Sequence, residues 1–271
     1  MKLNNLNNFA VFGLSFGGRQ FVRKCIEYGY KIKLIIDNDK EKDGKKFCNI
    51  PILLPEKAIK KKIEIVYLIG RYIKEQKQQL LNFGFPKNKI FYVPRKDIEI
   101  TGNFLNQRNK LTLSYLKTIS EVCTSIDIQV WLIDSGLLSA ARDQGLGSLS
   151  DFDLMLLGKQ KSSFLLKKLI NARSDWIIRN YYTSKNLDQL GTVIMSSELT
   201  EIVEPAVIDL KGLNTNPLLI KYPNLIENHF KNSFKNLEKT NIKYPNDYEK
   251  YLKILYGSNW QIPEDFFKPR Y

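Results

Sequence analysis

Short apolar runs alternate with amphipathic stretches along the first third of the chain. Residues 9–12 are apolar throughout, which is typical of a strand buried on both faces. A helix is predicted to open at Gly17-Gly18, because apolar side chains follow it at helical spacing. Further strands are predicted at residues 32–36, 63–69 and 89–93, with a helix through Leu80 and Leu81 before the last one. This alternation predicts an α/β domain with a parallel sheet of Rossmann type.

The pattern changes in the second part of the chain. Residues 95–108 are polar and non-periodic, so we interpret them as a linker between domain 1–94 and domain 109–271. A helix follows, because apolar residues from Leu113 to Ile126 form one face. A strand rich in branched and aromatic residues comes next, at residues 128–133, and residues 154–157 resemble a buried strand.

Composition limits the class of protein. Apolar residues make up 43% of the 271 residues and charged residues 26%, as in ordinary globular proteins. The net charge of +14 favours anionic partners such as nucleotides, anionic glycans or an anionic membrane surface. Alternatively, the abundance of lysine reflects biased genomic base composition. We expect no nucleic-acid partner, because the chain has no recognised motif and no compact basic and aromatic stripe.

Cysteine and histidine exclude several kinds of site. Three widely spaced cysteines favour reduced core thiols over a disulfide framework or a zinc site. His229 is the only histidine and is expected to be structural, so a Ser-His-Asp site is improbable. The first residues lack the pattern of a signal peptide, and no apolar run has the length of a membrane span. We therefore expect a cytoplasmic protein that can rest on the inner face of an anionic membrane.

The first turn of the N-terminal domain nearly matches a dinucleotide fingerprint. Gly13 and Gly18 occupy the positions of its first and third glycines, but Ser15 replaces the second. In the fingerprint, that second glycine is the residue that lets the backbone approach the pyrophosphate. Asp37 ends the second predicted strand, where an acidic residue would meet a ribose hydroxyl. We predict that NAD is an unlikely cofactor. The segments around Asp37, Gly44 and residues 49–52 resemble the small Rossmann-like accessory domain of many sugar-modifying enzymes.

Three aspartates of the second domain are candidate metal ligands. Asp151 and Asp153 alternate along a predicted strand and therefore point to the same face. Asp209 interrupts another apolar run, so a neighbouring strand would add a third carboxylate. Such a cluster binds hard divalent cations, and we predict Mg²⁺ or Mn²⁺ at Asp151, Asp153 and Asp209. The alternative is that each carboxylate lies on a solvated strand face.

Four ordered segments resemble the LicD family of phosphotransferases, which includes fukutin-related proteins. They are residues 133–142, the pair Asp151 and Asp153, residues 208–209 and residues 244–260. The resemblance implies an α+β nucleotidyltransferase-like domain that moves a phospho-substituent, such as phosphocholine or a polyol phosphate, from a CDP-linked donor. The implied acceptor is a hydroxyl of a surface glycan or its lipid-linked precursor.

The resemblance also implies residue roles. Ser135 and Gly136 would form a small turn that lets the donor phosphate approach the backbone, and Arg142 would neutralise a phosphate. From the chemistry of such a transfer, apart from the resemblance, we expect Asp134 to orient the acceptor or assist its deprotonation; alternatively, it caps the following helix. Two other functions stay open: a nucleotidyltransferase acting on a small phosphate or sugar, and a non-catalytic nucleotide-binding assembly protein.

Overall fold

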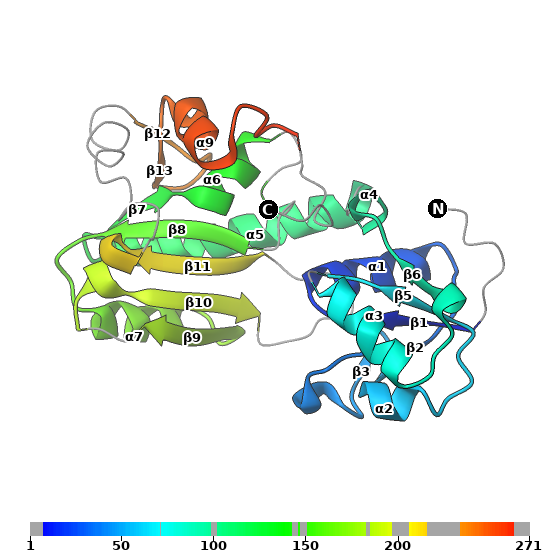
Figure 1. Ribbon diagram of the computed structural model, residues 1–271. Helices are drawn as coiled ribbons and strands as arrows, with labels where there is room; N and C mark the ends of the chain where they lie inside the picture. Colours follow the sequence, from blue (N-terminus) through cyan, green and yellow to red (C-terminus); the bar gives the residue numbers. More distant parts are fainter. Residues whose placement is uncertain are drawn as a thin grey trace. The chain divides into compact units, whose positions relative to one another are not determined.

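The chain divides into two compact units. The computed structural model describes residues 8–70, 72–98, 102–142, 146, 151–182, 185–196, 206–215 and 234–262. Unit 1 comprises the described residues up to 98, and unit 2 comprises those from Gly102 onwards. His229, predicted to be structural, lies outside the described residues. Figure 1 shows the elements of both units.

Unit 1 is an α/β fold with Rossmann strand order. Its strands are β1 (Phe9–Phe12), β2 (Ile32–Ile36), β3 (Lys46–Phe47), β4 (Ile50–Leu53), β5 (Ile65–Leu68) and β6 (Ile90–Tyr92). They are arranged in the order β3-β4-β2-β1-β5-β6, and all neighbours are parallel except the β3–β4 pair. The five parallel strands, numbered by their succession along the chain, read 3-2-1-4-5, which is the Rossmann arrangement. The predicted fold class of this half is confirmed.

Helices cover both faces of that sheet. They are α1 (Phe16–Glu27), α2 (Pro55–Ala58), α3 (Ile73–Asn82) and α4 (Arg95–Ile98), with single 3₁₀ turns at Lys40–Lys42 and Lys87–Lys89. Side chains alternate along β1, so that Phe9 and Val11 join the core under α1, whereas Ala10 and Phe12 join the core that contains Leu80 of α3. Two separate apolar cores therefore hold the strand ends, and the first turn after β1, in fixed positions.

Unit 2 is an α+β fold built on one mixed sheet. Its strands are β7 (Gln129–Leu132), β8 (Asp151–Leu157), β9 (Trp176–Tyr182), β10 (Gly191–Ser196), β11 (Val207–Gly212), β12 (Phe234–Asn236) and β13 (Ile242–Pro245). The sheet order is β12-β13-β7-β8-β11-β10-β9, in which β8 and β11 are parallel neighbours at the centre. The prediction of a mixed α+β second half is confirmed.

In the described residues of unit 2 the helices are α5 (Gly102–Thr124), α6 (Asp134–Ala141), α7 (Ser162–Ala172) and α9 (Tyr248–Tyr256), with 3₁₀ turns at Leu187–Gln189 and Leu213–Thr215. Helix α6 packs on β8, and α9 packs on α6. The segment predicted as a linker, residues 95–108, contains α4 and the first turns of α5. In the described part of the chain, no helix combines the length and the apolarity that crossing a membrane requires.

Candidate active site

The pairing of β8 with β11 brings two of the predicted carboxylates side by side. In this parallel ladder Asp209 lies opposite Asp153, and Val207 lies opposite Asp151. The neighbours Ile208 and Leu210 point to the other face and are fully buried. The alternation that buries the apolar side chains therefore holds both carboxylates on one face of the sheet, as the sequence pattern predicted.

Helix α6 meets these carboxylates with its first turn. Strand β7 stays paired with β8 up to Ile133, whose N–H donates to the carbonyl oxygen of Asp153 at 3.2 Å. Asp134 then adopts φ +43°, a left-handed conformation that Asp tolerates better than most residues. A side chain at Gly136 would place its Cβ only 2.4 Å from the carbonyl oxygen of Asp153. The glycine is therefore needed for the helix to approach the strand.

Asp153 is the centre of the hydrogen bonding at this turn. Its Oδ2 accepts the Ser135 N–H at 3.1 Å, and it also accepts the Ser135 hydroxyl. A carboxylate on a neighbouring strand thus caps α6, whose own N-cap residue, Ile133, has no side-chain acceptor. The alternative prediction that Asp134 caps this helix is wrong, because Asp134 is its first residue.

Lys211 lies among the carboxylates, and the sequence analysis did not identify it. Its Nζ is 2.6 Å from Asp153 Oδ1, 3.6 Å from Asp209 Oδ2 and 3.7 Å from Asp134 Oδ2. Burial lowers the pKa of the ammonium, but the charges of the three aspartates outweigh this effect and raise it above its usual range. We call Asp134, Asp153, Asp209 and Lys211 the carboxylate cluster. The signal that could have identified Lys211 is its spacing, two residues after Asp209 on the same strand face.

Two tyrosines of α9 extend the cluster. The Tyr251 hydroxyl, fully buried, donates to Asp134 Oδ1 at 3.0 Å. Burial, followed by the charge of Asp134, raises the pKa of Tyr251 well above its usual range. Burial together with the charges of Asp134, Asp153 and Asp151 does the same for the pKa of Tyr256. Both hydroxyls are therefore neutral at physiological pH. Tyr251 and Leu252 also lie in the core.

Arg142 makes hydrogen bonds to the segment that follows α9. Its Nε donates to the carbonyl oxygen of Trp260 at 3.1 Å, and its Nη2 donates to the same oxygen. This contact joins the end of α6 to the turn after α9. The phosphate-binding role that the LicD resemblance implies for Arg142 remains a prediction.

The predicted metal ligands do not fit a divalent ion as they are arranged. Among the residues that the structure describes, no three His, Cys, Asp or Glu side chains form a group that could hold a metal ion. Both oxygens of Asp153 have protein partners, Lys211 on one side and Ser135 on the other. Asp151 is exposed, and its backbone carbonyl accepts the Ser135 hydroxyl at 3.1 Å. Mg²⁺ or Mn²⁺ at Asp151, Asp153 and Asp209 stays a prediction.

In unit 1, the residues of the predicted nucleotide fingerprint make hydrogen bonds with one another. Gly13 has φ +102°, and a Cβ at Gly18 would lie 1.8 Å from its carbonyl oxygen, so both glycines permit a close turn. Ser15 is the N-cap residue of α1. The Asp37 carboxylate accepts the Leu14 N–H at 2.7 Å and the Asp39 N–H at 2.9 Å. Lys42 Nζ lies 3.3 Å from Asp37 Oδ1. The Asp37 carboxylate thus holds the turn itself, and the predicted cofactor-binding roles stay predictions.

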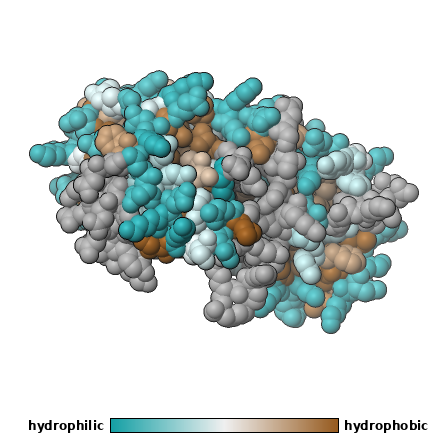
Figure 2. All heavy atoms as spheres, turned by 90° about the horizontal axis from the view of Figure 1, so that it is seen from above, coloured by the Kyte–Doolittle hydropathy of each residue, from teal (hydrophilic) through white to brown (hydrophobic). Residues whose placement is uncertain are grey.

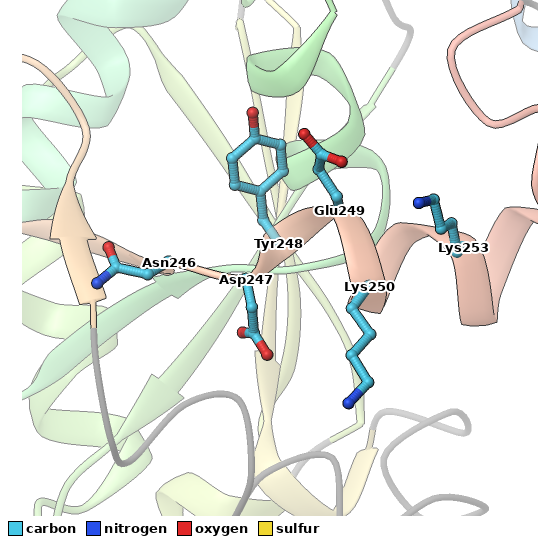
Figure 3. Close-up of a pocket in the computed structure, with 6 residues that line it drawn as sticks. All are labelled: Asn246, Asp247, Tyr248, Glu249, Lys250 and Lys253. Atoms are coloured by element: carbon cyan, nitrogen blue, oxygen red, sulfur yellow. The ribbon is translucent and has the colours of Figure 1, made fainter.

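A shallow hollow of about 360 Å³ lies elsewhere in unit 2, around the start of α9. It is lined by residues 246–250 and Lys253, and none of them belongs to the carboxylate cluster. Figure 3 shows the Tyr248 ring and Lys250 on opposite sides of the helix. Figure 2 shows a face of the protein on which hydrophilic side chains predominate over the described surface.

No protein-family model matches the chain, and no curated protein matches it. Some solved structures are similar to parts of it. A UDP-D-quinovosamine 4-dehydrogenase from Vibrio fischeri matches 33% of this chain and 95% of its own, with 20% identity and a TM-score of 0.23. A Rex-family repressor matches 44% of this chain and 63% of its own, with 16% identity and a TM-score of 0.28.

A nucleotidyltransferase-like protein from Paracoccidioides brasiliensis matches a larger part, 60% of this chain and 72% of its own. The identity is 10% and the TM-score is 0.33. At these TM-scores the similarities carry no argument about function. The resemblance to the LicD family therefore rests on the four sequence segments alone.

Proposed function

We propose that unit 2 is a transferase of phosphorus-containing groups. In this proposal it moves a phospho-substituent, such as phosphocholine or a polyol phosphate, from a CDP-linked donor to a hydroxyl of a surface glycan or its lipid-linked precursor. The observation that carries the proposal is the register of β8 and β11, which sets Asp153 beside Asp209 and opposite the first turn of α6. The resemblance of the same segments to LicD phosphotransferases supplies the donor and acceptor classes.

The proposed reaction needs few protein groups. The acceptor hydroxyl oxygen attacks the phosphorus atom of the phospho-substituent that is transferred, the bond from that phosphorus to the oxygen that bridges it to CMP breaks, and CMP leaves with the bonding electrons. The hydroxyl proton passes to a carboxylate of the cluster. Asp209 suits this role because its side chain keeps 21% of its exposure, against 6% for Asp153 and 11% for Asp134. Lys211 provides positive charge where the phosphoryl oxygens would gain negative charge.

The proposed location follows from the net charge. We place the protein in the cytoplasm, at the inner face of an anionic membrane, because a chain of net charge +14 is drawn to such a surface. A flotation assay with vesicles containing anionic lipid, compared with neutral vesicles, tests this location separately from catalysis.

The decisive experiment measures product formation with CDP-linked donors and glycan acceptors, using wild type, Asp209→Asn and Asp127→Asn. Asp127 is the matched control, since it is an exposed aspartate of unit 2 outside the cluster. We expect CMP as the leaving product and a loss of roughly 10²–10³-fold in kcat for Asp209→Asn only, as for removal of one catalytic polar group in other enzymes.

Other products lead to other conclusions. Release of pyrophosphate, with the nucleotide joined to the acceptor, would identify a nucleotidyltransferase. CDP binding that calorimetry finds unchanged by Asp209→Asn, together with no product, would overturn the transferase proposal in favour of a nucleotide-binding assembly protein. Thermal unfolding of each variant shows whether a lost activity reflects a lost fold.

A further inference from the structure

Lys211 lies where the carboxylates of the second unit converge. It follows Asp209 by two residues on β11, so both side chains project from the same face of the strand. Its side chain is only 16% exposed, which is unusual for a lysine. A buried ammonium is retained only where anionic partners compensate for its lost hydration. The partners here come from three elements: Asp134 begins α6, Asp153 lies on β8, and Asp209 lies on β11.

The oxygens that a metal ion would need are already engaged by the protein. Asp153 Oδ1 is 2.6 Å from the ammonium, and Asp153 Oδ2 accepts the N–H of Ser135 at 3.1 Å. Asp134 Oδ1 accepts the hydroxyl of Tyr251 at 3.0 Å, and Asp134 Oδ2 faces the ammonium at 3.7 Å. A divalent ion bridging these aspartates at about 2.0–2.6 Å from each oxygen would occupy the space that the ammonium fills.

We infer that Lys211 is the resident cation of the carboxylate cluster, in the place that Mg²⁺ or Mn²⁺ would take in a site of carboxylates alone. The wild-type protein then holds Asp134, Asp153 and Asp209 together without a divalent ion. Removing the ammonium leaves three carboxylates facing one another, which is the ligand set that a divalent ion binds. As arranged, the three aspartates do not form a group that could hold a metal ion, so a divalent ion binds here only when the ammonium is gone and the carboxylates close on the space that it vacates.

The inference also bears on the proposed transfer, and this part rests on the proposed function. If the donor is CDP-linked, its binding does not require a divalent ion, because Lys211 already supplies the positive charge beside the carboxylates. The sequence-based prediction of Mg²⁺ or Mn²⁺ at Asp151, Asp153 and Asp209 leads to the opposite result. A single Mn²⁺ titration therefore distinguishes the inference about Lys211 from the sequence-based prediction of a metal site.

The test is a calorimetric titration of Mn²⁺ into wild type, Lys211→Met and the double variant Lys211→Met/Asp209→Asn, with free Mn²⁺ also followed by electron paramagnetic resonance. Methionine keeps the length of the side chain and removes its charge. We expect no stoichiometric Mn²⁺ binding to wild type below 1 mM (roughly the weak end of protein sites). Lys211→Met should gain one Mn²⁺ with at least tenfold higher affinity, and the double variant should lose it.

Controls keep the result interpretable. Lys235→Met removes an exposed lysine of β12 in the same unit and should bind Mn²⁺ as wild type does. If Lys211→Met is unstable, its melting temperature with and without Mn²⁺ decides the matter: a rise specific to this variant supports the inference. Tight Mn²⁺ binding to wild type that is lost in Asp209→Asn, or a folded Lys211→Met that gains none, overturns it. CDP titrations in EDTA then test the donor separately, so a failure of the proposed function leaves the Mn²⁺ result standing.

Discussion

Gly136 is the residue on which the approach of α6 to β8 depends. The added Cβ of an alanine would meet the Asp153 carbonyl oxygen at 2.4 Å and its amide nitrogen at 3.1 Å. Both atoms belong to the backbone of a central strand, so neither can move away cheaply. The usual gain from replacing a helical glycine by alanine, about 0.5–1 kcal/mol, is outweighed by this overlap.

We therefore predict that Gly136→Ala lowers the free energy of unfolding of unit 2 by about 1–3 kcal/mol. Urea unfolding followed by tryptophan fluorescence measures it, because Trp131, Trp176 and Trp260 all belong to this unit. The comparison is Gly17→Ala in α1, where an added Cβ would lie 3.5 Å from its nearest neighbours; its effect on unit 1, which has no tryptophan, is followed by exposure of the buried Cys25 thiol in urea. Equal effects of the two substitutions on their own units would contradict the prediction.

Tyr251 offers a second test at the scale of one atom. Tyr251→Phe removes the hydroxyl that donates to Asp134 and leaves a buried carboxylate with one partner fewer. We expect a loss of about 1.5–3 kcal/mol in the stability of unit 2, the usual range for a hydrogen bond to a charged group. Tyr248→Phe is the control, since it retains the ring contacts with Tyr244 and Trp260. A loss below 0.5 kcal/mol (about the size of a surface substitution) would show that the hydroxyl contributes little.

At the scale of elements, Arg142 connects the end of α6 with the turn that follows α9. The guanidinium donates twice to the backbone carbonyl oxygen of Trp260. Trp260 itself is buried, with 4% of its surface exposed. A planar fork of donors suits such a double contact, and a lysine could make only a single-point contact. The helix that begins at the carboxylate cluster therefore also anchors the last described segment of the chain.

We predict that Arg142→Lys and, more strongly, Arg142→Ala expose Trp260 to solvent. Acrylamide quenching of tryptophan fluorescence should increase in both variants, with an emission shift to longer wavelength. Arg179→Ala, at an exposed position on β9, should leave the quenching unchanged. If the spectra of Arg142→Ala and wild type coincide, the contact does not hold Trp260 in place.

The sequence predicted elements better than the contacts between them. Residues 9–12 and 32–36 were predicted with the bounds that β1 and β2 have, because a short, mainly apolar run that ends at a turn residue is typical of a buried strand. The β3–β4 hairpin was missed, since a two-residue strand has no period to detect. The pairing of Asp153 with Asp209 was anticipated as a type of site, but the position of Lys211 depends on strand register, which local patterns do not contain.

At the scale of the whole molecule, each unit has its own core and its own buried thiol. Burial raises the pKa of Cys25 in unit 1 and of Cys123 in unit 2 to about 12, from an ordinary value of 9.0. The folded state thus keeps these protons more firmly than the unfolded state does. The resulting stabilisation is complete below pH 9 and is lost as the pH rises towards 12.

We predict that, in native protein at pH 8, a thiol reagent modifies Cys48 alone within minutes, because Cys48 is partly exposed and the other two thiols are buried and protonated. In Cys48→Ser, modification of Cys25 and Cys123 should appear only with urea. The urea dependence of Cys123 modification should follow that of tryptophan fluorescence, because both report the unfolding of unit 2. The urea dependence of Cys25 modification reports the unfolding of unit 1. Rapid modification of Cys123 in native protein would contradict the burial of that thiol.

The parallel pairing of β8 and β11 also has a kinetic consequence. Asp153 and Asp209 are far apart in the chain but adjacent in the sheet, so this pairing closes a long loop and is expected to form slowly. The pairing of β7 with β8, which holds Asp153 near Ser135, is more local in sequence, so we expect it to form first. Strand β11 then arrives carrying Asp209 together with its own neutralising lysine. Docking therefore adds no uncompensated negative charge, and the refolding rate of unit 2 should depend only weakly on salt.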